Sequence, residues 1–212
     1  MKTKTLIILA LTLVLLVTVA VPVYADRPTQ KIKYAHRSDG AVVPGGIVTT
    51  ELYAPVGDRS SNQGSRMVVK FRLGGINLDK MASAQLQLSI GRSKLDSTTY
   101  YKPFPNPGLG NTEVIHIADY GRILSSAAYS ASSIGNDPGV LWGADNVTSY
   151  QLPPIDVTAA VTQAKLAGYH FVTFRIQTVT ETDGDGKEDA WYFCTSEQPR
   201  EFRPALIINL AQ

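Results

Sequence analysis

The stretch RMVVKFRL, residues 66–73, alternates apolar and charged side chains over most of its length. Its odd-numbered positions hold methionine, valine, phenylalanine and leucine, whereas Lys70 and Arg72 occupy even-numbered positions. The stretch SAQLQLSI, residues 83–90, has the same period, with alanine, leucine and isoleucine at the even positions and serine and glutamine between them. Successive side chains of a strand point to opposite faces of a sheet, so this period predicts strands with one buried face.

Five further stretches also have the character of strands, and Gly, Pro, Asn and Asp cluster between them as they do in turns. In the second of these stretches, the alternation predicts that His116 points out of the apolar face. The five predicted strands are IVTTELY (47–53), TEVIHIA (112–118), FVTFRIQT (171–178), AWYFCTS (190–196) and ALIINL (205–210).

One helix is predicted directly after PPIDVT, the sequence that ends at Thr158. Thr158 is expected to cap the first turn, and Gly168 is expected to end the helix. Val161, Ala164 and Leu166 would then lie roughly on one side. A helix this short is expected to cross between strands.

Many strands, hairpin-length turns and few helices predict an all-β fold, an antiparallel β-sandwich of the jelly-roll type with one short helix. We expect one domain, in which an N-terminal segment with the first strands, residues 26–64, joins the rest of the sandwich, residues 65–212. Residues 100–150 are rich in Gly, Pro and small polar residues around isolated aromatic ones. This composition predicts long surface loops, where functional residues are common.

The first 25 residues have the order of a secretory signal. Two lysines precede an almost unbroken apolar run, residues 6–21, and VYA ends at Ala25 with small residues at the two positions that a signal peptidase reads. We expect cleavage after Ala25. The alternative is retention as an N-terminal anchor, because the run approaches the ~20 residues of a membrane span. The remaining chain is therefore expected to be extracellular or at the cell surface, with no membrane span after signal removal.

The charge balance argues against a nucleic-acid partner. The chain has 20 Lys and Arg and 18 Asp and Glu, so removal of Lys2 and Lys4 leaves a formal net charge of zero. A nucleic-acid-binding protein needs a basic face. The single cysteine, Cys194, allows no intrachain disulfide, and its place among aromatic residues predicts a buried structural thiol rather than a nucleophile.

Five segments follow one another in the order RMVVKFRL, ASAQLQLSI, IDVTAAVTQAKLAG, FVTFRIQT and FCTSEQPREFRPALIINL. Their order and spacing, over roughly residues 65–210, resemble the DNRLRE domains, which are also classed as a carbohydrate-binding module family and are related to repeats beside archaeal disaggregatase. In that family a basic residue precedes a YLKFDL-like strand, DVT opens a short helix, and SRE precedes RPRL on the last strand. The resemblance implies a jelly-roll sandwich of the kind found in secreted polysaccharide-binding modules and surface proteins.

The chain also departs from the pattern of that family. Arg72 stands where the family usually has aspartate. Glu197 follows Ser196 without the intervening arginine, and the tryptophan-containing central motif of the family is absent. These departures concern the implied binding of sugar more than the implied fold, because one fold hosts many functions.

The stretch ETDGDGKEDAWYF, residues 181–193, carries five acidic residues with a spacing partly like that of a calcium loop. Tyr192 stands where the bidentate glutamate of an EF-hand is required, so an EF-hand is excluded. We favour a structural calcium site, since calcium accepts oxygen ligands in flexible geometry. The alternative is a solvated hairpin, because DGDG is good turn chemistry. The candidate ligands are Glu181, Asp183, Asp185, the backbone carbonyl of Lys187, and Asp189.

A carbohydrate-binding surface needs aromatic rings on which sugar rings stack, with polar groups around them. Trp191 lies beside Phe193 in a predicted strand and is expected in the core. Trp142 is either a platform or a residue packed under its loop, and Asn146 begins the glycosylation sequon NVT. The candidate ligand-binding residues are Tyr100, Tyr101, Trp142 and Tyr150.

The scattered histidines and acidic residues match no catalytic motif, so we predict that the protein is not an enzyme. We predict instead a secreted noncatalytic carbohydrate-binding or cell-surface matrix module, whose partner is a polysaccharide or surface glycan. The alternative is a structural subunit of an extracellular filament or sheath. Such a subunit would self-assemble by lending residues 26–46 to a neighbour as a strand.

Overall fold

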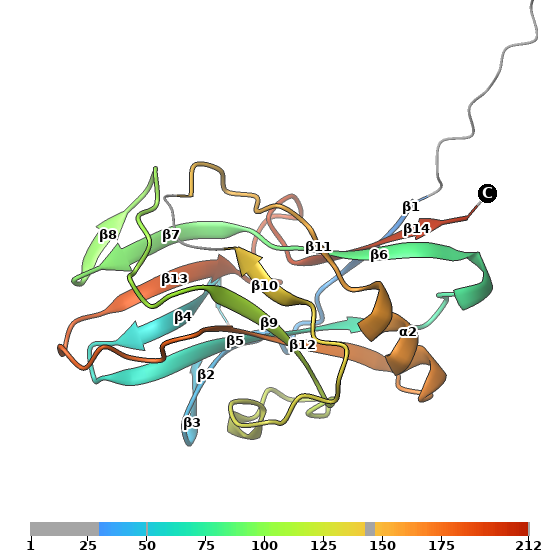
Figure 1. Cartoon of the computed structure of the whole chain (residues 1–212), viewed down its shortest axis with the longest axis horizontal. Helices are drawn as coiled ribbons and strands as arrows, with labels where there is room; N and C mark the ends of the chain where they lie inside the picture. The colour runs from blue at the N-terminus through green and yellow to red at the C-terminus, as the bar shows by residue number, and fades with distance from the viewer. Residues whose placement is uncertain (1–29, 50, 143–146, 212) are drawn as a thin grey trace, which may run out of the picture.

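The structure of the chain is a computed structural model that describes residues 30–49, 51–142 and 147–211. Its strands form two antiparallel sheets that enclose one main hydrophobic core (Figure 1). The predicted all-β antiparallel sandwich is thereby confirmed. No helix within the described residues has the length and apolar character needed to cross a membrane. The predicted signal peptide, residues 1–25, and the sequon residue Asn146 lie outside the described residues.

The smaller sheet has four strands in the order β1, β14, β6, β11. Because β1 pairs with β14, the N-terminal segment completes a sheet of its own molecule. The four strands are β1 (Gln30–Tyr34), β6 (Met81–Gln87), β11 (Ile155–Asp156) and β14 (Ala205–Leu210).

The larger sheet has ten strands, eight of them in the order β10, β9, β12, β5, β4, β13, β7, β8, while β2 pairs with β3 and β5. In Figure 1, β6 and β7 follow one another along one side of the sandwich, so the chain passes there from the smaller sheet to the larger one. The ten strands are β2 (Gly40–Val43), β3 (Gly46–Thr49), β4 (Tyr53–Arg59), β5 (Gln63–Arg72), β7 (Ile90–Leu95), β8 (Thr98–Tyr100), β9 (Thr112–Ile117), β10 (Gly139–Trp142), β12 (Phe171–Thr178) and β13 (Asp189–Cys194). Two 3-10 turns complete the fold, η1 (Leu78–Lys80) and η2 (Ser126–Ala128).

The main core contains the side chains that the period of two predicts. Trp191 and Phe193 of β13 are fully buried there, which confirms the prediction that Trp191 belongs to the core. Cys194 is buried as well, and its burial raises the pKa of the thiol to about 12, as expected of a structural cysteine. The inward residues of β5 and β6 are Met67, Val69, Phe71, Ala84 and Leu86.

The outer face of β5 and β12 is also covered, by the loop that follows β9. Val68 of β5 packs with Leu124 of this loop in a second, smaller cluster. Arg175 of β12 donates hydrogen bonds to backbone carbonyls within residues 128–131 and so holds the loop on the sheet. Burial, together with the nearby Arg66, lowers the pKa of Arg175 to about 10, so its guanidinium remains charged at neutral pH.

The prediction that His116 points out of the apolar face is wrong. His116 is fully buried, and its ring centroid lies 5.8 Å from that of Phe174 in the neighbouring strand. Val114 is equally buried, because alternate residues of β9 face the core. The Nδ1 atom lies 2.9 Å from the carbonyl oxygen of Gly135, and burial lowers the pKa of the imidazole. His116 is therefore a packing residue.

The helix α2 (Thr158–Leu166) lies where it was predicted, but its N-terminal cap and its buried side differ. Val157, not Thr158, occupies the N-cap position and makes no side-chain cap hydrogen bond, while Oδ1 of the preceding Asp156 accepts the backbone N–H of Thr158 at 2.8 Å. The Thr158 hydroxyl is already engaged by β6, where it accepts the backbone N–H of Ala84 at 2.9 Å. Leu166 is 76% exposed, so the prediction that it shares one side of the helix with the buried Val161 and Ala164 is also wrong. The buried residues of the helix are Ala160, Val161 and Ala164.

Candidate functional site

The outward face of β4, β7 and β13 carries two adjoining hollows of about 420 and 530 Å³. Tyr53 and Arg92 line both, so the two hollows meet at these residues. We refer to them together as the aromatic groove. Its principal lining residues are Tyr53, Arg92, Tyr101, Tyr150, Tyr192 and Phe202.

A β-bulge in β7 turns Arg92 toward the groove. Ile90 pairs with Phe193 and Arg92 pairs with Tyr192, and the register shifts between these two pairs. The extra residue, Gly91, inverts the alternation, so that Ile90 faces the core while Arg92 lies on the outward face with Tyr192. Simple alternation would place Arg92 and Ile90 on the same face.

Tyr53 lies directly against the backbone of β7 at this bulge. A Cβ atom added to Gly91 would lie only 2.0 Å from Cε1 of Tyr53 and 2.8 Å from two further atoms of its ring. The absence of a side chain at Gly91 therefore lets the ring rest on the strand. This contact fixes one wall of the groove.

The Arg92 guanidinium is held by aromatic rings. Its central carbon lies 4.3 Å from the centroid of the Tyr192 ring and 5.4 Å from that of Tyr53, both within the range of cation–π contacts. Its buried Nε–H has no hydrogen-bond acceptor among the residues that the structure describes. The rings orient this donor-rich group without saturating its hydrogen-bonding capacity, so it is suited to a ligand that carries oxygen acceptors.

Two of the four predicted ligand-binding residues line the groove. Tyr101 is 72% exposed, and Tyr150 packs edge-on against Phe202 with their ring centroids 6.1 Å apart. The ammonium group of Lys102 lies 3.7 Å from the centroid of the Tyr150 ring. The groove therefore combines exposed ring surface with a second cation near its edge.

The other two predicted residues lie elsewhere. Tyr100 belongs to β8 and lines neither hollow. The ring of Trp142 packs against those of Trp191 and Phe193, with centroid separations of 5.2 and 5.7 Å. The structure therefore supports the second of the two alternatives for Trp142, a residue packed under its loop.

Sequence reasoning missed four of the six principal lining residues of the groove. Tyr192 carries a usable signal, because it alternates with Trp191 and Phe193, which were expected inside. Tyr53 ends a predicted strand and gives no such signal. The bulge hides Arg92, and Phe202 lies in a turn between β13 and β14 whose path depends on tertiary contacts.

A second cluster of interest lies in the loop that joins β12 to β13, which we term the acidic loop, residues 179–188. Oxygen atoms of Asp185, Asp189 and Asp96 lie within 4.8 Å of one another. Asp96 comes from the β7–β8 turn, where it and Ser97 have φ angles of 51° and 63°. Positive φ at both central residues is typical of a type I′ hairpin, so a short turn brings this third carboxylate to the loop.

The carboxylates of this cluster are partly neutralised within the chain. The Lys187 ammonium lies 2.8 Å from Asp96 and 3.6 Å from Asp185. Asp189 is nearly fully buried, and burial followed by repulsion from neighbouring carboxylates raises its pKa. The structure therefore groups Asp185 and Asp189, two of the predicted metal ligands, with the side chain of a third predicted residue, Lys187.

The carboxylates of the two remaining predicted metal ligands, Glu181 and Asp183, contact other groups of the chain. Glu181 forms an ion pair with Arg66 and accepts a hydrogen bond from Tyr129 at 3.0 Å. The carboxylate of Asp183 accepts the backbone N–H of Asp185 at 3.2 Å.

A buried aspartate not considered in the sequence lies beneath the acidic loop. Asp58 is fully buried, and its Oδ2 accepts hydrogen bonds from the Thr182 hydroxyl and, at 3.2 Å, from the Asp183 N–H. Its Oδ1 has no hydrogen-bond partner among the described residues. An unsatisfied buried carboxylate oxygen is costly, so this atom favours a further donor or a cation at the loop.

The two clusters offer different chemistry. The aromatic groove presents flat apolar rings together with hydrogen-bonding groups, and the acidic loop presents oxygen ligands. No protein-family model matches the chain, and a search of curated proteins found no match. The functional argument therefore rests on these side chains.

Proposed function

We propose that the protein is a noncatalytic carbohydrate-binding module that acts outside the cell or at its surface, and that the aromatic groove holds the glycan. The observation that carries this proposal is the Arg92 guanidinium in contact with both the Tyr53 and Tyr192 rings, in a groove that the exposed Tyr101 also lines. The partly exposed ring of Tyr53 and the exposed ring of Tyr101 offer apolar contact to the C–H face of a sugar, while Tyr192, only 6% exposed, orients the guanidinium that offers donors to the sugar oxygens.

The sequence supports the same proposal independently. The five segments that resemble the DNRLRE domains imply a secreted polysaccharide-binding or surface module. Tyr53 and Tyr192 stand on the strands β4 and β13, so these two rings of the groove are held in fixed positions. Fixed aromatic rings lose little conformational entropy when a ligand binds.

Electrophoresis through gels that contain soluble xylan, mannan, β-glucan or pectin tests the proposal, because a bound polysaccharide retards the protein. Tyr53→Ala and Tyr101→Ala should each weaken binding about tenfold or more, since truncation of a central aromatic contact costs about 1–2 kcal/mol. Tyr100→Ala is the matched control, because Tyr100 is partly exposed, neighbours Tyr101 and lines neither hollow of the groove. Full retention of binding by both groove variants would contradict the proposed site.

We further propose that calcium stabilises the acidic loop in a structural role. Asp96, Asp185 and Asp189 supply clustered oxygens, and Asp58, whose Oδ1 has no partner in the described part of the chain, already binds the loop through Oδ2. Backbone carbonyls and water would complete the six to eight oxygens that calcium takes. The Lys187 ammonium would have to move aside, so it competes with the ion.

A further inference from the structure

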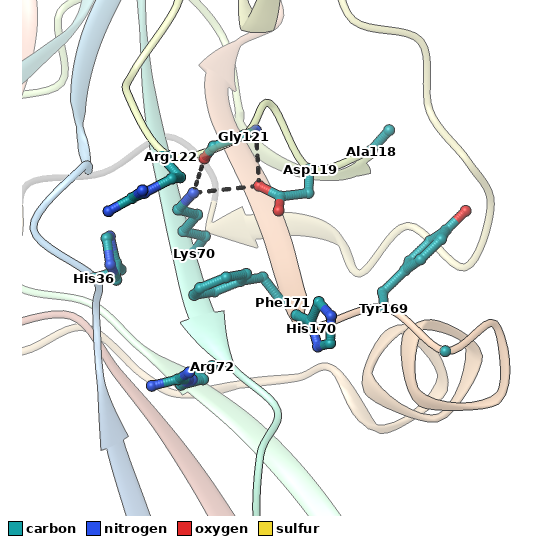
Figure 2. Close-up of a pocket in the computed structure, with 11 residues that line it drawn as sticks. His36, Lys70, Arg72, Ala118, Asp119, Gly121, Arg122, Tyr169, His170 and Phe171 are labelled. Atoms are coloured by element: carbon teal, nitrogen blue, oxygen red, sulfur yellow. Dashed lines mark hydrogen bonds and ion pairs between the residues drawn. The ribbon is translucent and has the colours of Figure 1, made fainter.

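A third hollow, of about 770 Å³, lies away from the aromatic groove and shares no lining residue with it. It opens between the end of β5, the loop after β9 and the segment that joins α2 to β12 (Figure 2). We term it the basic pocket. Its charged and histidine lining side chains are His36, Lys70, Arg72, Asp119, Arg122 and His170.

The floor of the basic pocket is a buried lysine. Lys70 is 1% exposed, and its ammonium lies 3.3 Å from Asp119 and donates to the carbonyl of Gly121. The same ammonium lies 4.5 Å from the centroid of the Tyr120 ring and 4.7 Å from that of Phe171. Asp119 therefore compensates one buried cation, and Lys70 is held rigidly in place.

The rim carries two arginines that remain uncompensated. Arg72 lies two residues after Lys70 on β5 and so on the same face of the sheet. Arg122 follows Gly121 in the loop that Lys70 holds, and Figure 2 shows its side chain beside that of Lys70. Both arginines are exposed, and within the described parts of the chain neither forms an ion pair.

The residues that follow α2 form the opposite wall of the basic pocket. Gly168 has φ +75° and donates to the carbonyl of Lys165, while Tyr169 donates to that of Ala164, which together form the Schellman ending of a helix. The chain reverses here and presents Tyr169 and His170 to the pocket. One side of the rim therefore belongs to β5, and the opposite side belongs to the turn between α2 and β12.

The charges of the pocket do not balance. Lys70, Arg72 and Arg122 oppose the single carboxylate of Asp119, which leaves two positive charges when the histidines are neutral. A pocket with two unpaired guanidinium groups on its rim attracts a ligand with two negative charges.

We propose that the basic pocket binds a doubly charged tetrahedral oxyanion, as free sulfate or phosphate or as the phosphate monoester of a small organic molecule. The guanidinium forks of Arg72 and Arg122 match the paired oxygens of such a group. A phosphate monoester carries nearly two charges at neutral pH. The volume is in the range that holds a small organic ligand, and the Phe171 and Tyr169 rings supply an apolar wall for it.

Isothermal titration calorimetry at constant ionic strength tests the proposal with inorganic sulfate, glucose 6-phosphate, glucose and acetate. Sulfate and glucose 6-phosphate should both bind, whereas glucose should not. Tighter binding of the ester than of sulfate would identify a small organic phosphate as the ligand. Equal affinity for sulfate and the ester would identify the free ion as the ligand. Acetate binding as tight as that of sulfate, or no binding of either dianion, would overturn the proposal.

Substitutions locate the site. Arg72→Gln and Arg122→Gln should each weaken sulfate binding about tenfold or more, because each removes a charged hydrogen-bond donor. Arg200→Gln is the matched control, since Arg200 is exposed and does not line the pocket. Tyr53→Ala should leave sulfate binding unchanged, which separates this proposal from that of the aromatic groove. Unchanged binding in both pocket variants would place the anion elsewhere and refute the site.

The three histidines of the chain provide a second readout. His36 and His170 line the pocket, whereas His116 is buried beside Phe174 and serves as an internal reference. Sulfate should shift the NMR signals of the first two imidazoles and leave the third unchanged. A shift of His116 alone, or of none of the three, would contradict the proposed location even if calorimetry detects binding.

Discussion

At the scale of single residues, Gly91 is the position on which the aromatic groove depends most directly. Gly91→Ala should displace the Tyr53 ring, because the new Cβ would lie 2.0 Å from Cε1 of that ring. The ring can swing outward, so we expect a loss of polysaccharide binding of about tenfold, equivalent to about 1.4 kcal/mol, with a smaller loss of stability. Affinity electrophoresis and a thermal melt measure the two effects.

Gly74→Ala is the matched control for that substitution. A Cβ at Gly74 would meet nothing within 4 Å, and Gly74 does not line the groove. Its polysaccharide binding and its melting temperature should equal those of the unmodified protein. If Gly91→Ala also binds polysaccharide normally, the position of the Tyr53 ring is not a determinant of binding.

Asp39 links stability to pH. It is fully buried, and its carboxylate accepts the backbone N–H of Ser196 at 2.7 Å and also the hydroxyl of the same residue. Burial raises its pKa from 3.8 to about 6, although these hydrogen bonds act in the opposite direction. Between these two pH values the folded protein binds more protons than the unfolded chain. The Asp39 contribution to the free energy of unfolding therefore falls as pH rises from about 4 to about 6.

Asp39→Asn should remove this contribution. The amide can still accept the Ser196 N–H and donate to its hydroxyl, so the fold should persist. The decrease in unfolding free energy between about pH 4 and about pH 7 should become smaller by up to about 3 kcal/mol relative to the unmodified protein. Urea denaturation at several pH values measures this change in the unfolding free energy, and Asp79→Asn, a substitution on the surface, is the control. An identical pH dependence in the two proteins would show that Asp39 does not titrate in this window.

At the scale of elements, the sandwich was predictable because period-two patterns in β5, β6 and β13 mark buried faces directly. The position of Arg92 was not predicted, because Gly91 alone does not distinguish a bulge from the end of a strand, and the bulge is defined only by pairing with β13. Lys70 illustrates the same limit. Its alternation indicates a solvated face, yet the loop after β9 covers that face and buries the ammonium.

The acidic loop shows what a contiguous motif can and cannot predict. Sequence spacing identified Asp185 and Asp189, but the third clustered carboxylate is Asp96, roughly ninety residues away in the chain. A local signal for this turn existed, since Asp96 and Ser97 separate two stretches that pair as a hairpin. That signal predicts a turn, whereas its contact with the β12–β13 loop follows only from the pairing of β7 with β13.

Calcium should raise the melting temperature of the protein, and chelation should reverse the effect. At a calcium concentration 100 times the dissociation constant, stabilisation is about 2.7 kcal/mol, which corresponds to roughly 5–10 °C for a chain of this size. The double variant Asp96→Asn, Asp185→Asn should lose the calcium-dependent shift, and Asp79→Asn should keep it. Lys187→Met should enlarge the shift, because it removes the competing ammonium. An unchanged melt together with metal-free purified protein would refute the calcium proposal.

At the scale of the whole molecule, the N-terminal segment decides between an independent module and a strand-exchanging subunit. In the structure β1 pairs with β14, and β2 pairs with β5, so residues 30–43 are integrated into both sheets of their own chain. Asp39 lies between these strands and binds Ser196 near the other end of the sequence. Deletion of the entire segment would therefore damage the fold and would not test assembly cleanly.

The edge of the smaller sheet provides a cleaner test. Lys31 and Lys33 are charged residues on β1, whose one neighbour among the described strands is β14, and lysines on an edge strand oppose pairing with another chain. We therefore expect a chain that begins at residue 26 to be monomeric by light scattering, with or without calcium. Deletion of residues 26–34 should uncover the edge of β14 and promote association, whereas deletion of residues 26–29 should not. Polymers of the longer chain that dissolve when β1 is removed, with the fold retained, would instead support a filament subunit that lends β1 to its neighbour.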